Sequence, residues 1–356
     1  MHPRATATPR PRRVLTATAA GLAVLTASLT GCGSAGSGTT TSPATSASPA
    51  SSASTATSGT TATGYPVTVD NCGTSVTFDK APGRVVTIKS STTEMLLALG
   101  AGDAIVGTAF PDGPAPEPWT DAAAALPVIS DKVPSNEVVL EQEPDLVYAG
   151  WESNFSADGA GERTSLETLG VRTYVSPSAC KAPEHRPDPL TFDAVFAEIT
   201  EVGTIMGREA QAAELVAAQR ADLGAVLQDD RGLSALWFSS GSDTPYVGGG
   251  IGAPALIMAT AGLANIGESI DDSWGPMSWE AVADADPDVI VLVDSPWNSA
   301  DKKIAYLESH PVTAELSAVR GSAYVVVPFP ASEAGVRTVS AAADVADQLT
   351  KLTFER

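Results

Sequence analysis

The sequence predicts an α/β protein of two doubly wound lobes joined by a long helical connector, preceded by a β-hairpin. Short apolar strands alternate with helical segments between residues 84 and 175, and the alternation starts again after residue 235. Residues 191–228 between these regions have no strand pattern and keep helical spacing. Strands that alternate with helices form parallel sheets covered on both faces. Two such regions around a helical stretch therefore predict lobe, connector, lobe.

The residues before the first lobe are not expected to belong to the fold. A basic stretch, Met1–Arg13, precedes an apolar run, Val14–Leu29, and the residues that follow end at Cys32. This is the layout of a secretory signal, and Leu-Thr-Gly-Cys resembles the lipobox of bacterial lipoproteins. We therefore expect a signal peptide over 1–31 and a lipid on Cys32; the alternative is an uncleaved membrane anchor. The uncharged residues 32–64, rich in Ser, Thr and Ala, are expected to form a disordered tether.

The N-terminal lobe is predicted over residues 65–188. It begins with a hairpin over Pro66–Phe78 that turns at Asn71-Cys72-Gly73, because Val67, Val69, Val76 and Phe78 alternate around that turn. The elements that follow are short apolar strands at 84–88, 105–107, 128–129, 146–149 and 172–175, interleaved with helices near 95–99, 135–142 and 158–169.

The connector is predicted over 189–230 and the C-terminal lobe over 231–356. Apolar residues from Leu190 to Ile205 recur at helical spacing, and a second, Ala-rich helix follows from Glu209. The C-terminal lobe is expected to contain strands at 235–239, 289–293 and 324–327 and helices near 253–261, 278–284 and 334–350.

Composition excludes several classes of function. The 356 residues carry 42 acidic and 21 basic side chains, a net charge of -21. Such a chain is not expected to hold nucleic acid or an anionic membrane surface through charge. Its three His residues are too few and too scattered for a metal or catalytic cluster, and no hydrolase, metalloprotease or P-loop motif occurs. We therefore expect neither an enzyme nor a cofactor.

One glycine-rich run is compatible with a second class of protein. Gly248–Ala253 fits G-x-G-x-x-A, a pattern of dinucleotide-binding turns, and the alternative reading is an exported dinucleotide-binding oxidoreductase. The run follows only a short segment, Tyr246-Val247, late in the chain. A Gly-rich loop before the helix 254–261 is the preferred interpretation.

The three cysteines fit an exported protein. With Cys32 lipidated, Cys72 and Cys180 remain as a candidate pair. In an oxidising compartment a disulfide is favoured over a metal site, which would need more Cys or His close by. The alternative is two separate buried thiols.

A sequence element occurs once in each lobe. Glu137 precedes Pro144-Asp145 by seven residues, and Glu280 precedes Pro287-Asp288 by the same distance. Each Pro-Asp is followed by an apolar strand.

These segments carry a resemblance to a known family. Arg84 to Gly100, Glu143 to Val147 and Asp286 to Ile290 resemble the substrate-binding proteins of iron-siderophore and cobalamin importers, and the similarity extends over residues 65–356. Four further segments resemble an actinobacterial subgroup proposed to take up a precursor of the deazaflavin coenzyme F-420: Asp70 to Gly73, Ala149 to Phe155, Pro177 to Lys181, and Pro328 to Arg337.

The resemblance implies a function and a set of partners. It implies an extracytoplasmic, lipid-anchored monomer that captures a small molecule between its lobes and passes it to an ABC permease with a cytoplasmic ATPase. It also implies that Glu137 and Glu280 meet Arg residues of the permease, although a first-turn acid favoured by the helix dipole would explain either residue alone. The ligands it allows are a deazaflavin precursor, a ferric siderophore, cobalamin and haem.

Candidate ligand contacts follow from the fold. Ligands of parallel sheets bind beyond the carboxyl ends of the strands, so the loops after the strands should face the cleft. From the N-terminal lobe these are Lys89, Ser90, Ser91, Thr92, Trp151, Glu152, Ser176 and Ser178. From the C-terminal lobe they are Ser239, Ser240, Tyr246, Trp297, Asn298, Phe329, Ser332 and Arg337, and the resemblance adds Trp274, whose counterpart in the other lobe is Asp131.

Two kinds of chemistry are expected from these residues. Lys89 and the three hydroxyl residues after it stand at a helix start, where an anion could bind; the alternative is an ordinary helix cap beside a solvated lysine. Trp151, Trp274 and Trp297 offer flat apolar faces for a ring system, unless they pack the lobes.

Overall fold

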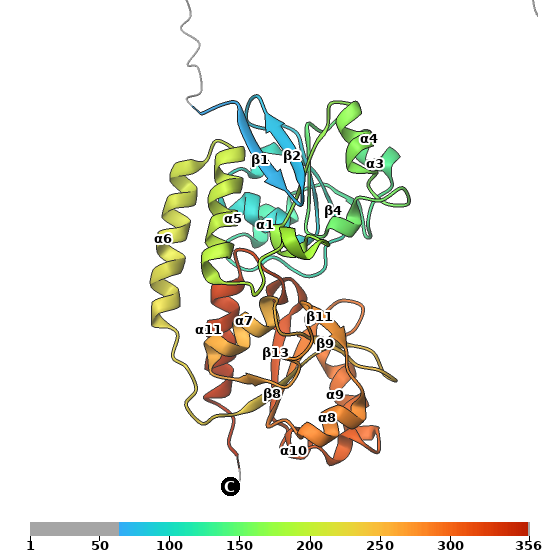
Figure 1. Ribbon diagram of the computed structural model, residues 1–356, viewed down its shortest axis with the longest axis vertical. Coiled ribbons are helices and arrows are strands. Elements are labelled where there is room, and N and C mark those ends of the chain that lie inside the picture. Colours follow the sequence, from blue (N-terminus) through green and yellow to red (C-terminus); the bar gives the residue numbers. More distant parts are fainter. Residues whose placement is uncertain (1–63, 355–356) are drawn as a thin grey trace, which may run out of the picture. The chain divides into compact units, whose positions relative to one another are not determined.

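A computed structural model describes residues 64–354, which belong to one compact unit of the chain, Thr60–Arg356 (Figure 1). The predicted signal peptide, Cys32 and all but the last residue of the tether lie outside the described residues. Within residues 64–354 no helix combines the length and apolar character that crossing a bilayer requires.

The chain enters the fold through the predicted hairpin. Strands β1 (Val67–Asn71) and β2 (Thr74–Phe78) pair in antiparallel register around Cys72-Gly73. Both turn residues have positive φ, 52° and 75°, which matches the twist of a two-residue hairpin turn. Val69, Val76 and Phe78 face the core, as their alternation predicts.

The N-terminal lobe is built on a five-stranded parallel sheet in the order β5-β4-β3-β6-β7. Its strands are β3 (Val85–Ile88), β4 (Ile105–Ala109), β5 (Val128–Ser130), β6 (Leu146–Ala149) and β7 (Arg172–Val175). Its helices are α1 (Ser90–Ala98), α2 (Thr120–Ala124), α3 (Asn136–Leu140) and α4 (Arg163–Thr168). The central strands β3 and β6 are fully buried, which explains their continuous apolar sequence.

Two helices form the predicted connector. Helix α5 (Phe192–Ile205) starts at Thr191, whose side chain accepts a hydrogen bond from the Ala194 N–H, and it packs against α6 (Glu209–Ala225). Residues at helical spacing on α5, including Val195, Ile199 and Val202, are buried in the core. The Gln219 amide of α6 donates to the Val336 carbonyl, so the connector also holds the C-terminal lobe.

The C-terminal lobe contains a mixed sheet along the order β11-β9-β8-β12-β13. Its strands are β8 (Ser234–Ser240), β9 (Tyr246–Gly248), β10 (Ala264–Asn265), β11 (Trp274–Pro276), β12 (Val289–Asp294) and β13 (Tyr324–Pro328). Its helices are α7 (Ala253–Ala261), α8 (Trp279–Ala285), α9 (Ala300–Ser309), α10 (Ser317–Arg320) and α11 (Thr338–Leu349).

The predicted two-lobed α/β class is confirmed, with local differences. The three predicted strands of the C-terminal lobe are parallel, whereas β9 and β11 add an antiparallel edge. Strands β9, β10 and β11 have two or three residues each, too few to produce an alternating pattern. Helices α2, α9 and α10 were also not predicted. Helix α1 begins at Ser90 rather than near residue 95. Helix α11 begins at Thr338 rather than near residue 334, and Glu333 and Arg337, which precede it, contact the other lobe.

The repeated Pro-Asp element has a structural role in both lobes. The Asp145 carboxylate accepts the backbone N–H groups of Gly83 and Arg84 just before β3. The Asp288 carboxylate accepts the N–H and hydroxyl of Ser234, the first residue of β8. In each lobe the aspartate thus fixes the start of the neighbouring parallel strand.

Candidate ligand-binding site

A cavity of about 400 Å³ is lined by residues of both lobes. The loops after β6 and β7 line one side, and β9, β11 and the loop after β13 line the other. Six serine residues line it, together with two indoles and a phenol: Ser91, Ser153, Ser176, Ser178, Ser273, Ser332, Trp151, Trp274 and Tyr246. A volume in this range, with aromatic faces and many hydroxyls, suits a small ligand with flat and polar parts.

The structure brings eight of the predicted contacts together and leaves the others outside the cavity. Those that line it are Ser91, Trp151, Glu152, Ser176, Ser178, Tyr246, Trp274 and Ser332. Those that do not are Lys89, Ser90, Thr92, Ser239, Ser240, Trp297, Asn298, Phe329 and Arg337. The cavity is also lined by polar residues that the sequence does not single out: Ser153, Lys181, Asp272, Ser273 and Glu333, each one to three positions from a predicted residue, and Arg186, which lies further along the loop after β7.

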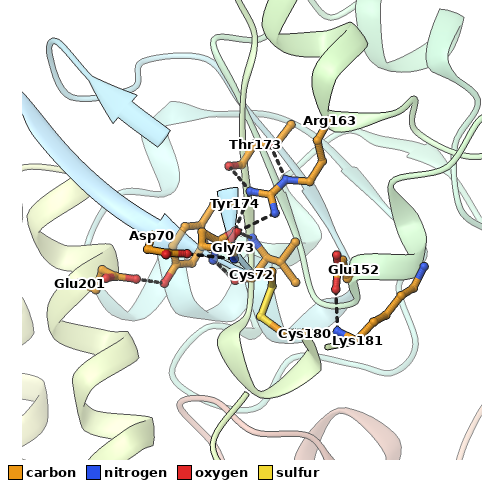
Figure 2. Close-up of a disulfide and its surroundings, with 12 residues drawn as sticks. Asp70, Cys72, Gly73, Glu152, Arg163, Thr173, Tyr174, Cys180, Lys181 and Glu201 are labelled. Carbon is orange, nitrogen blue, oxygen red and sulfur yellow. Dashed lines mark hydrogen bonds between the residues drawn. A yellow bond between two sulfur atoms is a disulfide. The ribbon is translucent and has the colours of Figure 1, made fainter. Parts of the chain in front are cut away.

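One wall of the cavity is fixed by the predicted disulfide. Cys72 and Cys180 are bonded across 108 residues of sequence, which joins the hairpin turn to the loop after β7 (Figure 2). Beside the bond, the Asn71 side chain exchanges two hydrogen bonds with the backbone of Val175, and Arg163 donates to Asn71 as well. The Glu152 carboxylate accepts the Lys181 N–H at 2.6 Å. These contacts hold the loops at residues 151–154 and 176–181 in place beside the cavity.

A buried polar chain runs from the cavity to the connector. The Ser176 hydroxyl lies 3.4 Å from the Tyr148 hydroxyl, which donates to a carboxylate oxygen of Glu198 on α5 at 2.9 Å. Burial raises the pKa of Glu198 to about 7, while the hydrogen bond from Tyr148 opposes that rise. Burial therefore favours the neutral form of the Glu198 carboxyl.

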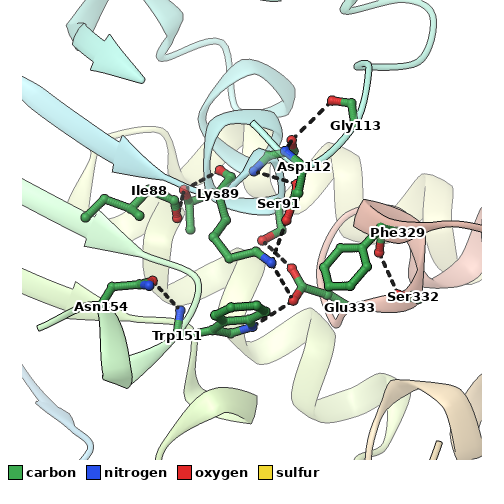
Figure 3. Close-up of polar contacts among 12 residues, drawn as sticks. Ile88, Lys89, Ser91, Asp112, Gly113, Trp151, Asn154, Phe329, Ser332 and Glu333 are labelled. Atoms are coloured by element: carbon green, nitrogen blue, oxygen red, sulfur yellow. Dashed lines mark hydrogen bonds and ion pairs between the residues drawn. The ribbon is translucent and has the colours of Figure 1, made fainter. Parts of the chain in front are cut away.

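Lys89 is enclosed between the lobes rather than open to solvent (Figure 3). Its ammonium lies 2.5 Å from an Asp112 oxygen and 3.0 Å from a Glu333 oxygen, and its side chain is 0% exposed. The same nitrogen is 3.5 Å from the Trp151 ring centroid and 4.4 Å from that of Phe329. The Trp151 indole N–H also donates to Glu333 at 2.7 Å. In this arrangement the ammonium of Lys89 is paired with two carboxylates of the protein, Asp112 and Glu333, rather than directed at an anionic ligand.

The backbone at this cluster is strained. Lys89 has φ 87° and ψ 152°, a region that residues other than glycine rarely occupy, and Phe110 has φ 52°. Both residues directly follow strands, β3 and β4, and both side chains belong to the cluster, since the Phe110 ring lies 5.2 Å from the Lys89 nitrogen. The strain places a charged side chain at the lobe interface instead of in solvent.

A second buried ion pair joins the lobes. The Arg337 guanidinium donates two hydrogen bonds to the Glu94 carboxylate on α1 and one to the Pro114 carbonyl. Burial raises the pKa of Glu94 above its ordinary value, although Arg337 lowers it. Arg337 therefore has a partner in the other lobe and does not line the cavity.

A third ion pair lies at the rim of the cavity. Arg186, after β7, meets Asp272 of the loop before β11 at 3.2 Å. The three inter-lobe pairs together define a conformation in which the lobes are in contact around the cavity.

The glycine-rich run has a structural explanation. The Gly249 and Gly250 N–H groups donate to the backbone carbonyls of Ser273 and Ile270. A Cβ on Gly249 or Gly250 would lie about 2.1 to 2.2 Å from the carbonyl oxygens of Asp272 or Glu268. These two N–H groups are therefore paired with the chain's own backbone and are not free to hold a pyrophosphate. Among residues 64–354 no three His, Cys, Asp or Glu side chains are placed to bind a metal ion.

Two α/β lobes around a polar, aromatic cavity are the architecture of a solute-binding protein, and the chain belongs to the family of periplasmic binding proteins, which it matches over residues 85–329. It is 25% identical over 298 residues to the ABC transporter substrate-binding lipoprotein YvrC of Bacillus subtilis, covering 82% of this chain and 88% of that one. Family members of this type are subunits of ABC importers that work with a permease and an ATPase.

Solved structures agree with this assignment. A periplasmic binding protein from Veillonella parvula superposes with a TM-score of 0.70 at 27% identity, covering 81% of this chain and 98% of that chain. A protein of an Fe3+-hydroxamate transport system from Saccharomonospora viridis superposes with a TM-score of 0.68 at 27% identity, covering 80% of this chain and 99% of that chain.

A second sequence relative is a cobalamin-binding protein of Halobacterium salinarum. It is 28% identical over 238 residues, which cover 64% of this chain and 58% of that protein.

Proposed function

We propose that the protein is a lipid-anchored solute receptor of an ABC importer that captures one small ligand in the inter-lobe cavity and delivers it to the permease. The observation that carries this proposal is the cavity itself, which is built by strand ends of both lobes and has Trp151 on one side and Trp274 on the other. Cys32 would carry the lipid and residues 32–64 would give the receptor reach from the membrane.

The cavity chemistry favours a ligand with a flat conjugated ring and a hydroxyl-rich chain. Indole faces suit ring stacking, and the six serine side chains can donate to or accept from hydroxyls. We therefore propose a deazaflavin coenzyme precursor as the ligand. Ferric siderophore and cobalamin, which two relatives are named for, are the alternatives.

The ligand can be identified without choosing a candidate in advance. Native mass spectrometry and an absorbance spectrum of protein purified from its own cells should show one bound molecule per chain. A deazaflavin chromophore would support the proposed ligand, whereas an iron chelate or a corrinoid would replace it and leave the receptor function standing. Protein that never carries a small molecule would contradict the receptor proposal.

Once the ligand is known, the role of the indoles can be measured. We expect Trp151→Ala or Trp274→Ala to weaken binding by about 1 to 3 kcal/mol, because each removes a large aromatic contact. Trp297→Ala is the matched control, because Trp297 is 50% exposed and does not line the cavity. An equal loss in all three variants would show that the effect is on lobe packing.

Delivery is proposed to use Glu137 and Glu280. Both are exposed in the first turn of a short helix, α3 or α8, that is capped by a serine side chain, Ser135 or Ser278. Hydrogen bonds from its own N–H and from Ser135 lower the pKa of Glu137, so it is ionised at neutral pH. Neither residue lines the cavity. Two exposed carboxylates, one on each lobe, suit recognition by two arginines.

The docking proposal is tested by uptake. Glu137→Ala with Glu280→Ala should abolish or strongly reduce transport and leave ligand affinity unchanged. The control is Glu209→Ala with Asp301→Ala, which removes two other exposed first-turn acids, on α6 and α9. Transport at the wild-type rate by the first pair would refute docking through these residues.

A further inference from the structure

The buried contact between the lobes holds an excess of negative charge. Three carboxylates, of Glu94, Asp112 and Glu333, face two cations, Lys89 and Arg337. Lys89 is 0% exposed, and the side chains of Glu333 and Arg337 are 10% and 8% exposed. A charge without a full partner is costly in such surroundings, and taking up one proton removes the excess.

The cluster joins the cavity to the lobe contact through shared residues. Glu333 comes from the C-terminal lobe, whereas Lys89, Asp112 and Trp151 come from the N-terminal lobe (Figure 3). Trp151 and Glu333 also line the cavity. Separation of the lobes must therefore break the pair between Lys89 and Glu333 and expose the cavity at the same time.

We infer that Lys89, Asp112 and Glu333 form an inter-lobe latch whose closure is coupled to proton uptake, so that the cavity closes more firmly as the external medium becomes more acidic. This inference rests on the proposed function only for the meaning of closure as ligand capture. The strained backbone of Lys89 supports it, because such strain persists where surrounding contacts over-determine a functional position.

The sign of the effect follows from the groups around Glu333. Burial is the largest influence and raises the pKa of Glu333 to about 7; Lys89 lowers it, Asp112 raises it, and the hydrogen bonds from Lys89 and Trp151 lower it. On the cavity side, Glu333 is surrounded by two acidic and two basic side chains: Glu152, Asp272, Lys181 and Arg186. When the lobes are apart, the Glu333 carboxyl is solvated and its pKa returns toward the usual value for a glutamate. A raised pKa in the closed state means that closure is favoured below pH 7 and loses this contribution as the pH rises through 7.

The test measures closure in the ligand-free full chain, so its outcome does not depend on which ligand is bound. The Leu190 N–H, at the start of the connector where the chain leaves the N-terminal lobe, donates to the Ile251 carbonyl of the C-terminal lobe at 2.7 Å, and its hydrogen-exchange protection, corrected for the intrinsic rate, reports closure. Between about pH 8 and about pH 6 the protection should rise roughly tenfold, the factor expected for one proton taken up near pH 7.

Variants separate the latch from a general effect of pH. Glu333→Gln should abolish the rise, and the control Glu268→Gln, which removes an exposed carboxylate of the same lobe, should keep it. If Glu333→Gln does not fold, Asp112→Asn takes its place and should reduce the rise, because it removes the repulsion that raises the pKa of Glu333. Protection that stays constant or falls toward pH 6 in the wild type, or an unchanged rise in Glu333→Gln, would overturn the inference.

Discussion

Removal of one partner of the buried pair between Glu94 and Arg337 should destabilise the protein strongly. The Glu94 side chain is 1% exposed and that of Arg337 is 8% exposed, and the guanidinium makes two of its hydrogen bonds to this carboxylate. Glu94→Ala leaves the cation buried with only the Pro114 carbonyl as acceptor. Breaking a buried pair in this way costs about 3 to 5 kcal/mol of unfolding free energy.

The double variant should behave differently from the single ones. Burial already raises the pKa of Glu94 despite Arg337, which indicates that desolvation outweighs the attraction between the two charges. Glu94→Leu combined with Arg337→Met should therefore recover most of the loss seen in Glu94→Ala.

Urea unfolding of the wild type, Glu94→Ala, Arg337→Met and the double variant, with the slope of each transition compared, measures these differences in unfolding free energy. Arg220→Met is the matched control, because it breaks the exposed pair with Asp193 and should cost at most about 1 kcal/mol. A loss below about 1 kcal/mol in Glu94→Ala, or a double variant less stable than Glu94→Ala or Arg337→Met, would show that this buried pair does not contribute as expected.

Three further results are expected. Reduction of the Cys72–Cys180 disulfide should lower the unfolding free energy by about 4 to 5 kcal/mol in the chain-entropy account of a loop of 108 residues; a reduced protein that unfolds at the same urea concentration would contradict it. Because burial raises the pKa of Glu198 to about 7, the stability that its neutral form provides should be lost as the pH rises through 7. The unfolding free energy of Glu198→Gln should therefore fall less between about pH 6 and pH 8 than that of the wild type. An identical fall in both proteins would exclude Glu198 as the source. Phe329→Ala should destabilise the lobe contact, because its ring covers the Lys89 ammonium at 4.4 Å, and Leu190 should then exchange faster; unchanged exchange would contradict this.

Much of the fold could be predicted because its signals are local. The apolar strands, the helical spacing of α5 and the turn at Cys72-Gly73 depend on neighbouring residues, and the structure confirms them. The pairing of Cys72 with Cys180 was predictable because compartment and cysteine count left few choices. Strands β9 and β11 could not be found, because their few residues acquire strand structure only by pairing with β8 and with each other.

The location of the cavity was predictable, whereas its ligand contacts stay a prediction. Strand ends led to Trp151 and Ser178, and the resemblance to the importer proteins added Trp274; all three line the cavity. The same rule placed Lys89 and Arg337 among the ligand contacts, because the sequence does not show that Glu333 and Glu94 meet them from the opposite lobe. Partners separated by more than 240 residues leave no local pattern. A Lys directly after a buried strand was the one available signal of an unusual position.

A crystal structure of protein purified with its natural ligand from its own cells would show whether one small molecule occupies the cavity between Trp151 and Trp274. We expect density for one molecule that contacts Trp151 and the serine hydroxyls, with Lys89 still paired to Glu333. Density elsewhere on the protein, or a ligand that displaces Lys89 and occupies the space among Trp151, Phe329 and Glu333, would show that the proposed binding site is wrong.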